Sequence, residues 1–515
     1  MQEKPNILMI FTDQQRWDTL AAYGNQKIHT PNLDRLAAQG VVFETAITPC
    51  PLCMPARASV MTGKSSSALQ CMENSYPKSV DNRETIAGLL AESGYHCQAI
   101  GKMHFSNTPY EETYGMHHMI LSEETRGVRT AKKADDIVLD DYDKFLAERK
   151  LWGWDKPTEI GYNEIKPLVA PLPKETHVTQ WCGDQTVAWL KECRPKNKPF
   201  FLWSSFVKPH VPYDCPQHLL AMYDPAQMDE PWVSEQDGCS LNPYFASYRK
   251  AKEFDLYSEE AGRKAKAYYY ANITFIDEQV GRILDALDEQ GLADSTLVIF
   301  SSDHGDLLGD HRLWYKCFGF EGSLRVPLLM RLPDHLHAGT RYEGLTSLLD
   351  LFPTILDAAG LNHRYTDRPG ISLLDMLEGK DGHERVFSEV MDSPYTMSHV
   401  RTAQYKYLFY QNGAYEQLFD LGKDPMELHD LAGDSRYEQV RQSLRDWAES
   451  YIAEYGNPKL HLDEKGSLRS EPYHVHTEPK QRPFSRMPWD GRFPSDEQTL
   501  FFTKDRRDWL DALQP

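Results

Sequence analysis

The sequence lacks an apolar run long enough to cross a membrane. No stretch of the 515-residue chain approaches the roughly 18 apolar residues of a spanning helix. The apolar segment Asn6–Phe11 is too short for the hydrophobic part of a secretory signal and leads directly into polar residues. We therefore expect no membrane association and, with Met1 as the native start, a cytoplasmic protein. A signal peptide removed earlier would instead indicate the periplasm or secretion.

Cysteine is sparse, with nine residues spread over the whole chain. An odd number without dense spacing does not make the disulfide framework that holds small secreted domains together. The cysteine content therefore predicts a reducing compartment, in agreement with the expected cytoplasmic location.

Basic residues are fewer than acidic ones: the chain has 56 Lys and Arg and 76 Asp and Glu, which gives a formal net charge of −20. Nonspecific nucleic-acid binding needs a basic surface, so we expect no nucleic-acid partner. The acidic excess is typical of a surface that keeps the protein soluble. A site for an anionic substrate would have to gather positive charge locally, against the field of the whole protein.

Short apolar runs alternate with helical patterns along the first part of the chain, which predicts a largely parallel sheet with helices on both faces. Hydrophobic residues make up 41% of the chain, enough for a large core. The runs expected to be strands are Ile7–Phe11, Val41–Phe43, Cys97–Ile100, Phe200–Trp203 and Leu297–Phe300.

Polar residues of the types that act in catalysis or metal binding follow several of these runs. The pairs, in chain order, are Asp13 with Gln14, Lys102 with His104, Lys208 with His210, and Asp303 with His304. Ligands of open α/β sheets bind outside the carboxyl ends of the strands. The pattern therefore predicts that these side chains assemble one polar site.

Composition changes after the first 380 residues, and we expect three parts. Residues 1–380 would form the large α/β domain, and 381–456 a smaller α+β domain with an antiparallel sheet and a helix. Residues 457–515 read as a tail packed on the body or on a neighbouring subunit, which predicts a homo-oligomer.

The segment Cys53–Gly63 places a possible nucleophile and a positive charge within a few residues of each other. Pro55 suits a first helical turn and Gly63 a helix end, so Cys53 would lie at a helix N-terminus. The free N–H groups and the helix dipole favour an anion there, and Arg57 adds a fixed positive charge one turn later. A nucleophile in this setting suits attack on a tetrahedral oxyanion.

Other interpretations of Cys53 stay open from the residues alone. Together with Cys50 it makes a C-x-x-C pair, which could be a redox pair or half of a zinc site. No thioredoxin-like pattern surrounds the pair, and no second C-x-x-C occurs. An inert buried cysteine is the remaining alternative.

Cys53-x-Pro55-x-Arg57 followed by Thr62-Gly63 resembles the motif of the type I, formylglycine-dependent sulfatases of the alkaline phosphatase superfamily. The Asp13-Gln14 pair is similar to the branch of choline sulfatases and phosphonate monoester hydrolases. Further similar segments are Pro5–Ile7, His29–Asp34, Gly101–His104, Lys208–His210, Ser302–Gly305, Gly309–His311 with Lys316, Arg325–Pro327, Leu418–Leu421 and Asp424–Pro425.

The resemblance implies an alkaline phosphatase-like catalytic domain over residues 1–380, and a maturation enzyme that converts Cys53 to formylglycine. It implies one divalent metal ion, held by Asp13, Gln14, Cys53, Asp303 and His304. These oxygen-rich ligands favour Ca²⁺, with Mg²⁺ or Mn²⁺ as alternatives. Gln14 stands where most of the family has a second aspartate, which leaves the metal identity open.

The resemblance also implies roles for the remaining site residues. One hydroxyl of the hydrated formylglycine would attack sulfur, and the other would later expel the sulfate after His104 takes its proton. Arg57 would favour deprotonation of the attacking hydroxyl. The groups expected to contact the substrate oxygens are Lys102, His210 and Lys316, together with Asn74.

Three functions remain in competition from the sequence. The first is that of an arylsulfatase-like sulfuric ester hydrolase acting on a sugar or aryl sulfate, and Lys102 and His104 favour it. The second is hydrolysis of phosphonate monoesters or phosphodiesters by the same site, which Gln14 and Asn74 favour. The third is a noncatalytic carbohydrate- or anion-binding protein, against which the intact Cys53 speaks.

Overall fold

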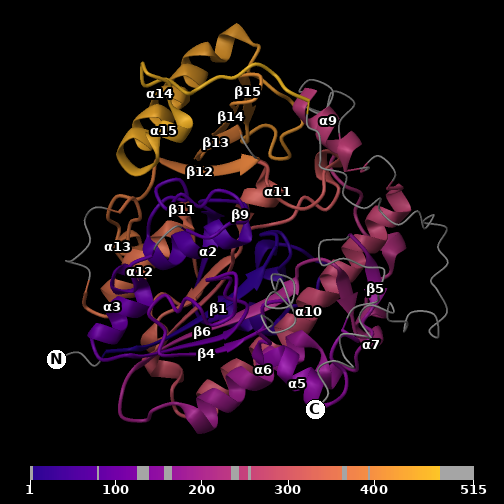
Figure 1. Ribbon diagram of the computed structural model, residues 1–515, viewed down its shortest axis with the longest axis vertical. Helices are drawn as coiled ribbons and strands as arrows, with labels where there is room; N and C mark the ends of the chain where they lie inside the picture. The colour runs from indigo at the N-terminus through magenta and orange to yellow at the C-terminus, as the bar shows by residue number, and fades with distance from the viewer. Residues whose placement is uncertain are drawn as a thin grey trace.

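A computed structural model of the chain describes residues 4–77, 80–124, 138–155, 165–233, 243–252, 254, 257–361, 368–392 and 395–475. Within these ranges a nine-stranded and a four-stranded sheet, with their covering helices, form a large lower part and a smaller upper part (Figure 1). None of the helices described is long and apolar enough to cross a membrane.

The large part is organised around a nine-stranded mixed sheet. The strand order is β11-β2-β10-β8-β1-β6-β3-β4, and β9 pairs with β2 outside this path. Strands β8, β1, β6, β3 and β4 run parallel, whereas β10 is antiparallel to β8 and β2. The strands are β1 (Asn6–Asp13), β2 (Val41–Ile47), β3 (His96–Gly101), β4 (His118–Leu121), β6 (Phe200–Pro209), β8 (Thr296–Ser302), β9 (Arg325–Val326), β10 (Leu328–Arg331) and β11 (Thr340–Ser347).

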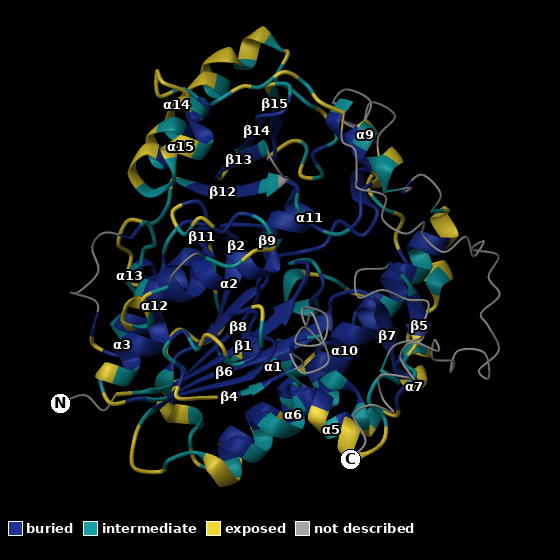
Figure 2. Cartoon of the chain, in the orientation of Figure 1, coloured by how far each residue is buried: buried dark blue, intermediate teal, exposed yellow. Residues whose placement is uncertain are grey.

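Strand β1 shows why both faces of the sheet are covered. Its side chains alternate between the faces, as those of any strand do. Leu8 and Ile10 join one hydrophobic cluster, whereas Ile7, Met9 and Phe11 join another. All five are fully buried, so a continuous apolar run is what a strand covered on both sides requires (Figure 2).

Helices supply the two covering layers (Figure 1). One face packs against α1 (Pro31–Ala38), α6 (Val178–Ala188) and the long α10 (Glu259–Glu289). The other packs against α2 (Cys53–Thr62), α3 (Ile86–Glu92) and α12 (Leu351–Ala358). Shorter elements are α5 (Asp141–Glu148), α7 (Gln217–Leu220), α9 (Pro243–Ala251), α11 (Glu321–Leu324), α13 (Leu373–Leu377), and the pair β5 (Pro167–Val169) and β7 (Tyr213–Cys215). The expected α/β sheet covered by helices on both faces is confirmed.

The polar residues at the carboxyl ends of the parallel strands lie at one edge of the sheet. Asp13 ends β1 and pairs in register with Pro209 of β6, while Gly101 of β3 pairs with Ser205. On the other side of β1, Thr12 pairs with Ser302, the last residue of β8. The residues that follow these strands are therefore brought to the same edge.

The smaller part is an antiparallel sheet in sequential order, and its strands are β12 (Arg385–Asp392), β13 (Tyr395–Thr402), β14 (Tyr405–Tyr410) and β15 (Tyr415–Asp420). The helix α14 (Glu438–Tyr455) packs on it through Leu444 and Ile452, and α15 (Pro458–His461) follows. The smaller α+β part of the predicted fold class is confirmed.

Of the tail predicted from residue 457 onward, 476–515 lie outside the described residues. The described part of the tail packs on its own chain. The backbone N–H of Gly413 donates to the carbonyl of Glu471 at 2.9 Å, and the hydroxyl of Tyr473 donates to the carbonyl of Pro243 at 2.9 Å.

A buried charge network joins the two parts. The ammonium of Lys406, on β14, lies 2.7 Å from Glu321 of α11 and 2.7 Å from Glu427. Arg401 contacts Glu321 at 3.2 Å. Burial acts to raise the pKa of Glu321, but Lys406 and then Arg401 outweigh it, so the pKa lies below its usual range. This carboxylate therefore stabilises the fold above the pKa of an unfolded glutamate, about 4.3, and the contribution falls as pH decreases below it.

Replacing Lys406 with methionine is expected to lower stability by about 3–5 kcal/mol at neutral pH, because it removes the cation that two buried carboxylates share and leaves Arg401 to compensate Glu321. The difference from wild type should shrink in acid, where Glu321 is protonated in the variant. Denaturant unfolding at pH 7 and pH 4 measures both effects. Lys380→Met, at an exposed ion pair with Asp375, is the control and should change little. Equal stability of the two variants would contradict the role given to the network.

Candidate active site

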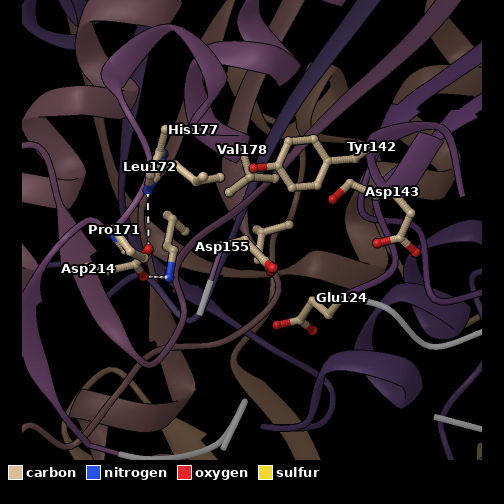
Figure 3. A pocket seen from close by; sticks show the side chains of 12 residues that line it. Glu124, Tyr142, Asp143, Asp155, Pro171, Leu172, His177, Val178 and Asp214 are labelled. Carbon is tan, nitrogen blue, oxygen red and sulfur yellow. Dashed lines mark hydrogen bonds and ion pairs between the residues drawn. The ribbon is translucent and has the colours of Figure 1, made fainter. Parts of the chain in front are cut away.

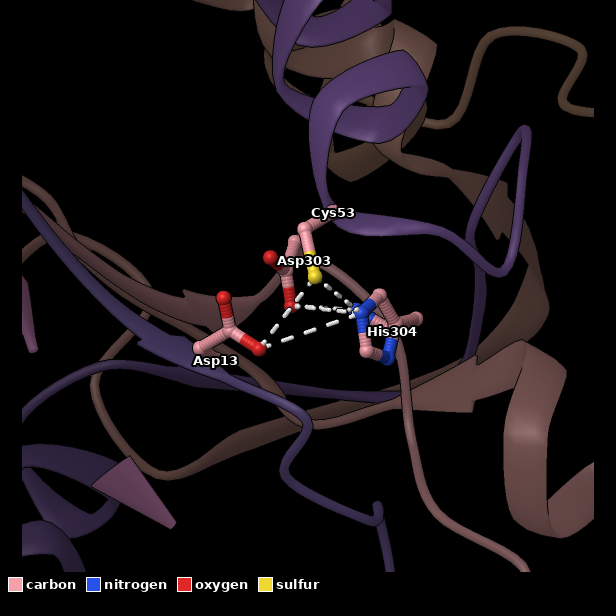
Figure 4. A group of neighbouring side chains, drawn as sticks. All are labelled: Asp13, Cys53, Asp303 and His304. Atoms are coloured by element: carbon pink, nitrogen blue, oxygen red, sulfur yellow. Dashed lines mark hydrogen bonds and ion pairs between the residues drawn. The ribbon is translucent and has the colours of Figure 1, made fainter. Parts of the chain in front are cut away.

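Four side chains converge at the carboxyl edge of the sheet (Figure 4). Asp13 ends β1, Cys53 is the first residue of α2, and Asp303 and His304 follow β8. All four are buried, and one ligand atom from each lies within 4.8 Å of the others. Asp13, Asp303 and His304 thus lie together at the strand ends, and the structure places Cys53 beside them, where the resemblance implied it.

The ring of His304 turns an unprotonated nitrogen toward this cluster. Its Nδ1 lies 2.9 Å from the carbonyl oxygen of Gly305, which assigns the proton to Nδ1. Burial, and then the charge of Lys316, hold the pKa of His304 well below its usual range. The remaining Nε2 lies 3.2 Å from the sulfur of Cys53 and 3.6 Å from Oδ1 of Asp303. A neutral histidine whose unprotonated nitrogen faces other possible ligand atoms is arranged to bind a metal ion.

Arg57 holds the carboxylates of Asp13 and Asp303 in place. Its guanidinium is fully buried and donates from Nε to Oδ2 of Asp303 at 2.9 Å, with Nη2 at 3.4 Å from Oδ2 of Asp13. It also donates to the carbonyl of Lys102 at 2.6 Å and to the hydroxyl of Ser205 at 2.8 Å. These bonds use one oxygen of each carboxylate and leave both Oδ1 atoms on the side of His304.

Positive charge is shared unequally by the two carboxylates. Burial acts to raise the pKa of Asp13, but Lys102 and the other cations around it outweigh burial, so this pKa lies well below its usual range. Burial, and next the neighbouring Asp13, raise the pKa of Asp303 to about 7. A further cation placed between the two Oδ1 atoms would lower it again, because opposite charge favours the ionised form.

Lys102 lies between two carboxylates. Its ammonium is 2.8 Å from Oδ2 of Asp13 and 2.6 Å from Oε2 of Glu124, and its side chain is fully buried. Burial acts to lower the pKa of Lys102, but Asp13 and Glu124 outweigh it and the net shift is upward. The lysine is therefore a permanently charged group at the site.

Lys316 brings a second ammonium to position 53. It donates to the sulfur of Cys53 at 3.2 Å and to the side-chain oxygen of Gln14 at 2.7 Å. Gln14 has a positive φ of 70° and donates from Nε2 to Asp306 at 2.6 Å. The structure thus places the Gln14 oxygen beside Lys316 and next to the four-residue cluster.

The remaining predicted residues line the same region. Nε2 of His104 and Nδ1 of His210 each lie 3.7 Å from the carboxylate of Glu124. Burial, and then Lys316 and Lys102, lower the pKa of His210 to about 3, so its ring is neutral at neutral pH. Asn74 accepts a hydrogen bond from the backbone N–H of Met54 at 3.4 Å, at the start of α2.

The thiol of Cys53 lacks the features of a redox cysteine. Burial, and then the charge of Asp13, raise its pKa to about 12, and burial also raises the pKa of Cys50. Reactive redox thiols have a lowered pKa, so the surrounding protein groups do not favour thiolate chemistry here. Both thiols are free, and the metal-ligand cluster contains only Cys53 of the pair.

Sequence reasoning missed Glu124, the carboxylate closest to Lys102, and Ser205, which fixes Arg57. Glu124 lies just beyond the carboxyl end of β4, so the strand-end rule could have found it, whereas Ser205 lies within β6. Neither stands in a motif with a recognisable spacing, and that is why they were overlooked.

An anion entering this site would meet two lysines and the N-terminus of α2 beside the side chain at position 53, which is the arrangement of a hydrolase for anionic esters. The chain belongs to the sulfatase family. The family described as Sulfatase matches residues 5–361, and the family described as N-sulphoglucosamine sulphohydrolase, C-terminal, matches residues 309–453. The chain is therefore a sulfuric ester hydrolase.

Named relatives agree with this assignment. The chain is 34% identical to an arylsulfatase of Clostridium perfringens over 461 residues, 86% of this chain and 93% of the relative. It is 32% identical to a choline-sulfatase of Rhizobium meliloti over 447 residues, 84% and 83% of the two chains. A solved phosphonate monoester hydrolase of Agrobacterium radiobacter superposes with a TM-score of 0.75 at 27% identity, covering 91% of this chain and all of that one. The alkaline phosphatase-like fold and the predicted branch of the superfamily are thereby confirmed.

Proposed function

We propose that the protein hydrolyses sulfate esters of sugars or aryl alcohols through a formylglycine made from Cys53, with one divalent metal ion. The observation that carries the proposal is the placement of residue 53. It begins a helix, faces Asp13 and His304, and accepts a hydrogen bond from Lys316 at 3.2 Å. Helix N-terminus, carboxylates and lysine together suit an oxyanion and a cation at neighbouring positions.

The residues present fit a hard divalent cation. The donor set offers the Oδ1 atoms of Asp13 and Asp303, Nε2 of His304 and the side chain at position 53, with the Gln14 oxygen nearby. The raised pKa of Asp303 speaks for a missing positive charge at this point. Oxygen donors favour Ca²⁺, with Mg²⁺ or Mn²⁺ as alternatives. When bound, the ion would supply Lewis acidity to the reacting oxygen.

The chain's own side chains would supply the attacking group, bind the sulfate and transfer the proton. Formylglycine, once hydrated, supplies the attacking hydroxyl. Lys102, Lys316 and His210 would contact the sulfate oxygens and offset the charge on the leaving oxygen, and Asn74 would reach the same oxygens from the start of α2. His104 would accept a proton from the remaining hydroxyl at position 53, so that the sulfate is released.

Arg57 would act as a positioning residue in this scheme. All four of its contacts given above are to protein groups, namely two carboxylates, one carbonyl and one hydroxyl. It would therefore hold Asp13 and Asp303 at the spacing the metal needs, and its fixed charge would favour ionisation at position 53.

Location and assembly extend the proposal. We infer a cytoplasmic protein that meets its maturation enzyme there, in keeping with its sparse cysteines. We also infer a homo-oligomer formed through the tail beyond residue 457, whose described part already packs on the body. Light scattering of the full chain and of a chain ending at residue 475 tests the second inference.

A sulfate ester is expected to be the preferred substrate over a phosphonate monoester. The fixed charge of Lys102 and the neighbouring His104 favour the charge that builds up when the S–O bond breaks. With 4-nitrophenol as the common leaving group, kcat/KM should be at least about tenfold higher for the sulfate than for the phenylphosphonate monoester, a barrier difference of about 1.4 kcal/mol. Much faster turnover of the phosphonate would instead favour the phosphonate and phosphodiester alternative, to which Gln14 and Asn74 point.

A further inference from the structure

Glu124 places a carboxylate among the groups that would bind the anion. Its Oε2 lies 2.6 Å from the ammonium of Lys102 and 3.7 Å from Nε2 of His104, and its Oε1 lies 3.7 Å from Nδ1 of His210. Only 7% of the side chain is exposed. A buried acidic group is therefore built into a site whose ligand is itself an anion.

The backbone around Glu124 is held firmly in place. The N–H of Ser122 donates to the carbonyl of Gly101 at 3.0 Å, which continues the pairing of β4 with β3. The carboxylate of Glu123 accepts from the backbone N–H of His104 at 3.0 Å, and its own N–H donates to Asp140 at 2.6 Å. These bonds tie the Glu124 backbone to the strand that also presents Lys102.

Glu124 also lines a small cavity, whose described lining is rich in acidic side chains (Figure 3). Its volume is about 30 Å³, and its lining includes Asp143, Asp155 and Asp214 in addition to Glu124. The lysine that lines it, Lys208, is paired with Asp214. A cavity of this size holds a water molecule or two and no leaving group. Among the described residues that line this cavity, acidic side chains therefore outnumber basic ones.

Lys102 brings less net positive charge to the site than its ammonium alone would. Lys102 is shared between Asp13 and Glu124, so its charge is already offset. A ligand with one negative charge adds little repulsion, whereas a second negative charge would lie close to the Glu124 carboxylate. At an effective dielectric constant of about 20, the repulsion between two unit charges about 5 Å apart weakens ligand binding by roughly a hundredfold, before screening by salt.

We propose that Glu124 selects ligands by charge, favouring groups with a single negative charge at the reacting end over doubly charged phosphate monoesters and inorganic sulfate. The inference rests on the proposed function and narrows its substrate class to sulfate monoesters and singly charged phosphorus esters. Hydrolysis converts a singly charged ester and water into an alcohol, a doubly charged sulfate ion and a proton. The same carboxylate therefore tolerates the substrate and repels the product.

The test compares wild type with Glu124→Gln, which removes the charge at nearly constant shape, and with Glu124→Asp, which keeps it. Three 4-nitrophenyl substrates at pH 8 separate charge from the identity of the central atom: the sulfate and the ethyl phosphate diester carry one charge, and the phosphate monoester carries two because its second pKa is near 6. Calorimetry of inorganic sulfate and of methanesulfonate, with the metal-loaded protein, measures binding without turnover.

In Glu124→Gln, we expect kcat/KM for the phosphate monoester to rise about ten- to hundredfold relative to both singly charged substrates, whose mutual ratio stays nearly constant. Inorganic sulfate should bind about tenfold or more tightly, and methanesulfonate should change little. Glu124→Asp should keep the wild-type ratios. Unchanged ratios in the glutamine variant, or equal shifts in the two variants, would overturn the proposal. Failure of the proposed function would show differently, as no sulfate turnover by the wild-type protein, while the binding comparison could still be made.

Discussion

Cys53→Ala is expected to reduce sulfate-ester hydrolysis by at least about 10⁴-fold, because removal of a covalent nucleophile leaves only the binding and electrostatic parts of catalysis. The loss should appear in kcat, since the lysines that would bind the sulfate remain. The fold should be retained, because the change removes a single sulfur atom from the first residue of α2. Steady-state kinetics with an aryl sulfate measures the effect.

Cys50→Ala is the matched control, since Cys50 is also fully buried and stands three residues earlier in the same C-x-x-C pair. It should retain most of the activity. Intact-mass analysis of the wild-type peptide that contains Cys53 should show a loss of about 18 Da, the conversion of cysteine to formylglycine. An unmodified thiol in protein from the native source, or equal losses in the two variants, would count against formylglycine chemistry and favour an anion-binding protein or a redox pair.

Asp303→Asn should remove both the bound divalent metal and the activity. The substitution takes away one charge from the donor set and weakens the ion pair with Arg57, which is buried at 2.9 Å. Loss of the ion should lower kcat/KM by about 10³-fold or more, since Lewis-acid stabilisation of the transition state amounts to several kcal/mol. Elemental analysis of the purified protein should find about one metal ion per wild-type chain and far less in the variant.

A second measurement separates loss of metal from loss of fold. A ligand at a hundred times its Kd stabilises a protein by about 2.7 kcal/mol, so a chelator should lower the thermal midpoint of wild type but not of Asp303→Asn. Asp277→Asn is the control, because Asp277 is also buried yet accepts from the backbone of α1 and is outside the cluster. Full metal content in Asp303→Asn would rule out Asp303 as a ligand.

Much of the site could be predicted because its signals are local. Cys53, Pro55 and Gly63 predict a helix beginning near residue 53, and α2 begins at Cys53 with Gly63 in the left-handed conformation at its end. Asp13 and Asp303 each follow an apolar run, and parallel strands place such residues at one edge by geometry alone. These inferences needed no knowledge of which strands are neighbours.

Helix α1 shows where local signals fall short. The position of Thr30 before Pro31 predicts a helix cap, yet its side chain makes no capping hydrogen bond. The free N–H groups of Asn32 and Leu33 donate instead to Asp277 of α10, at 3.1 and 2.7 Å. The acceptor is 244 residues from Leu33 along the chain, so only the packing of α10 against α1 supplies it.

The amino-acid sequence by itself determined the fold class, the family and the segment that holds the proposed nucleophile, because strand periodicity, helix ends and the Cys53 motif are set by residues close together in the chain. Tertiary structure alone decided how the charges compensate one another. Arg57 bridges Asp13 and Asp303, and Glu124 comes to rest against Lys102, since strands distant in sequence are neighbours in the sheet. Electrostatic energy depends on distances between atoms, and the order of residues does not contain those distances.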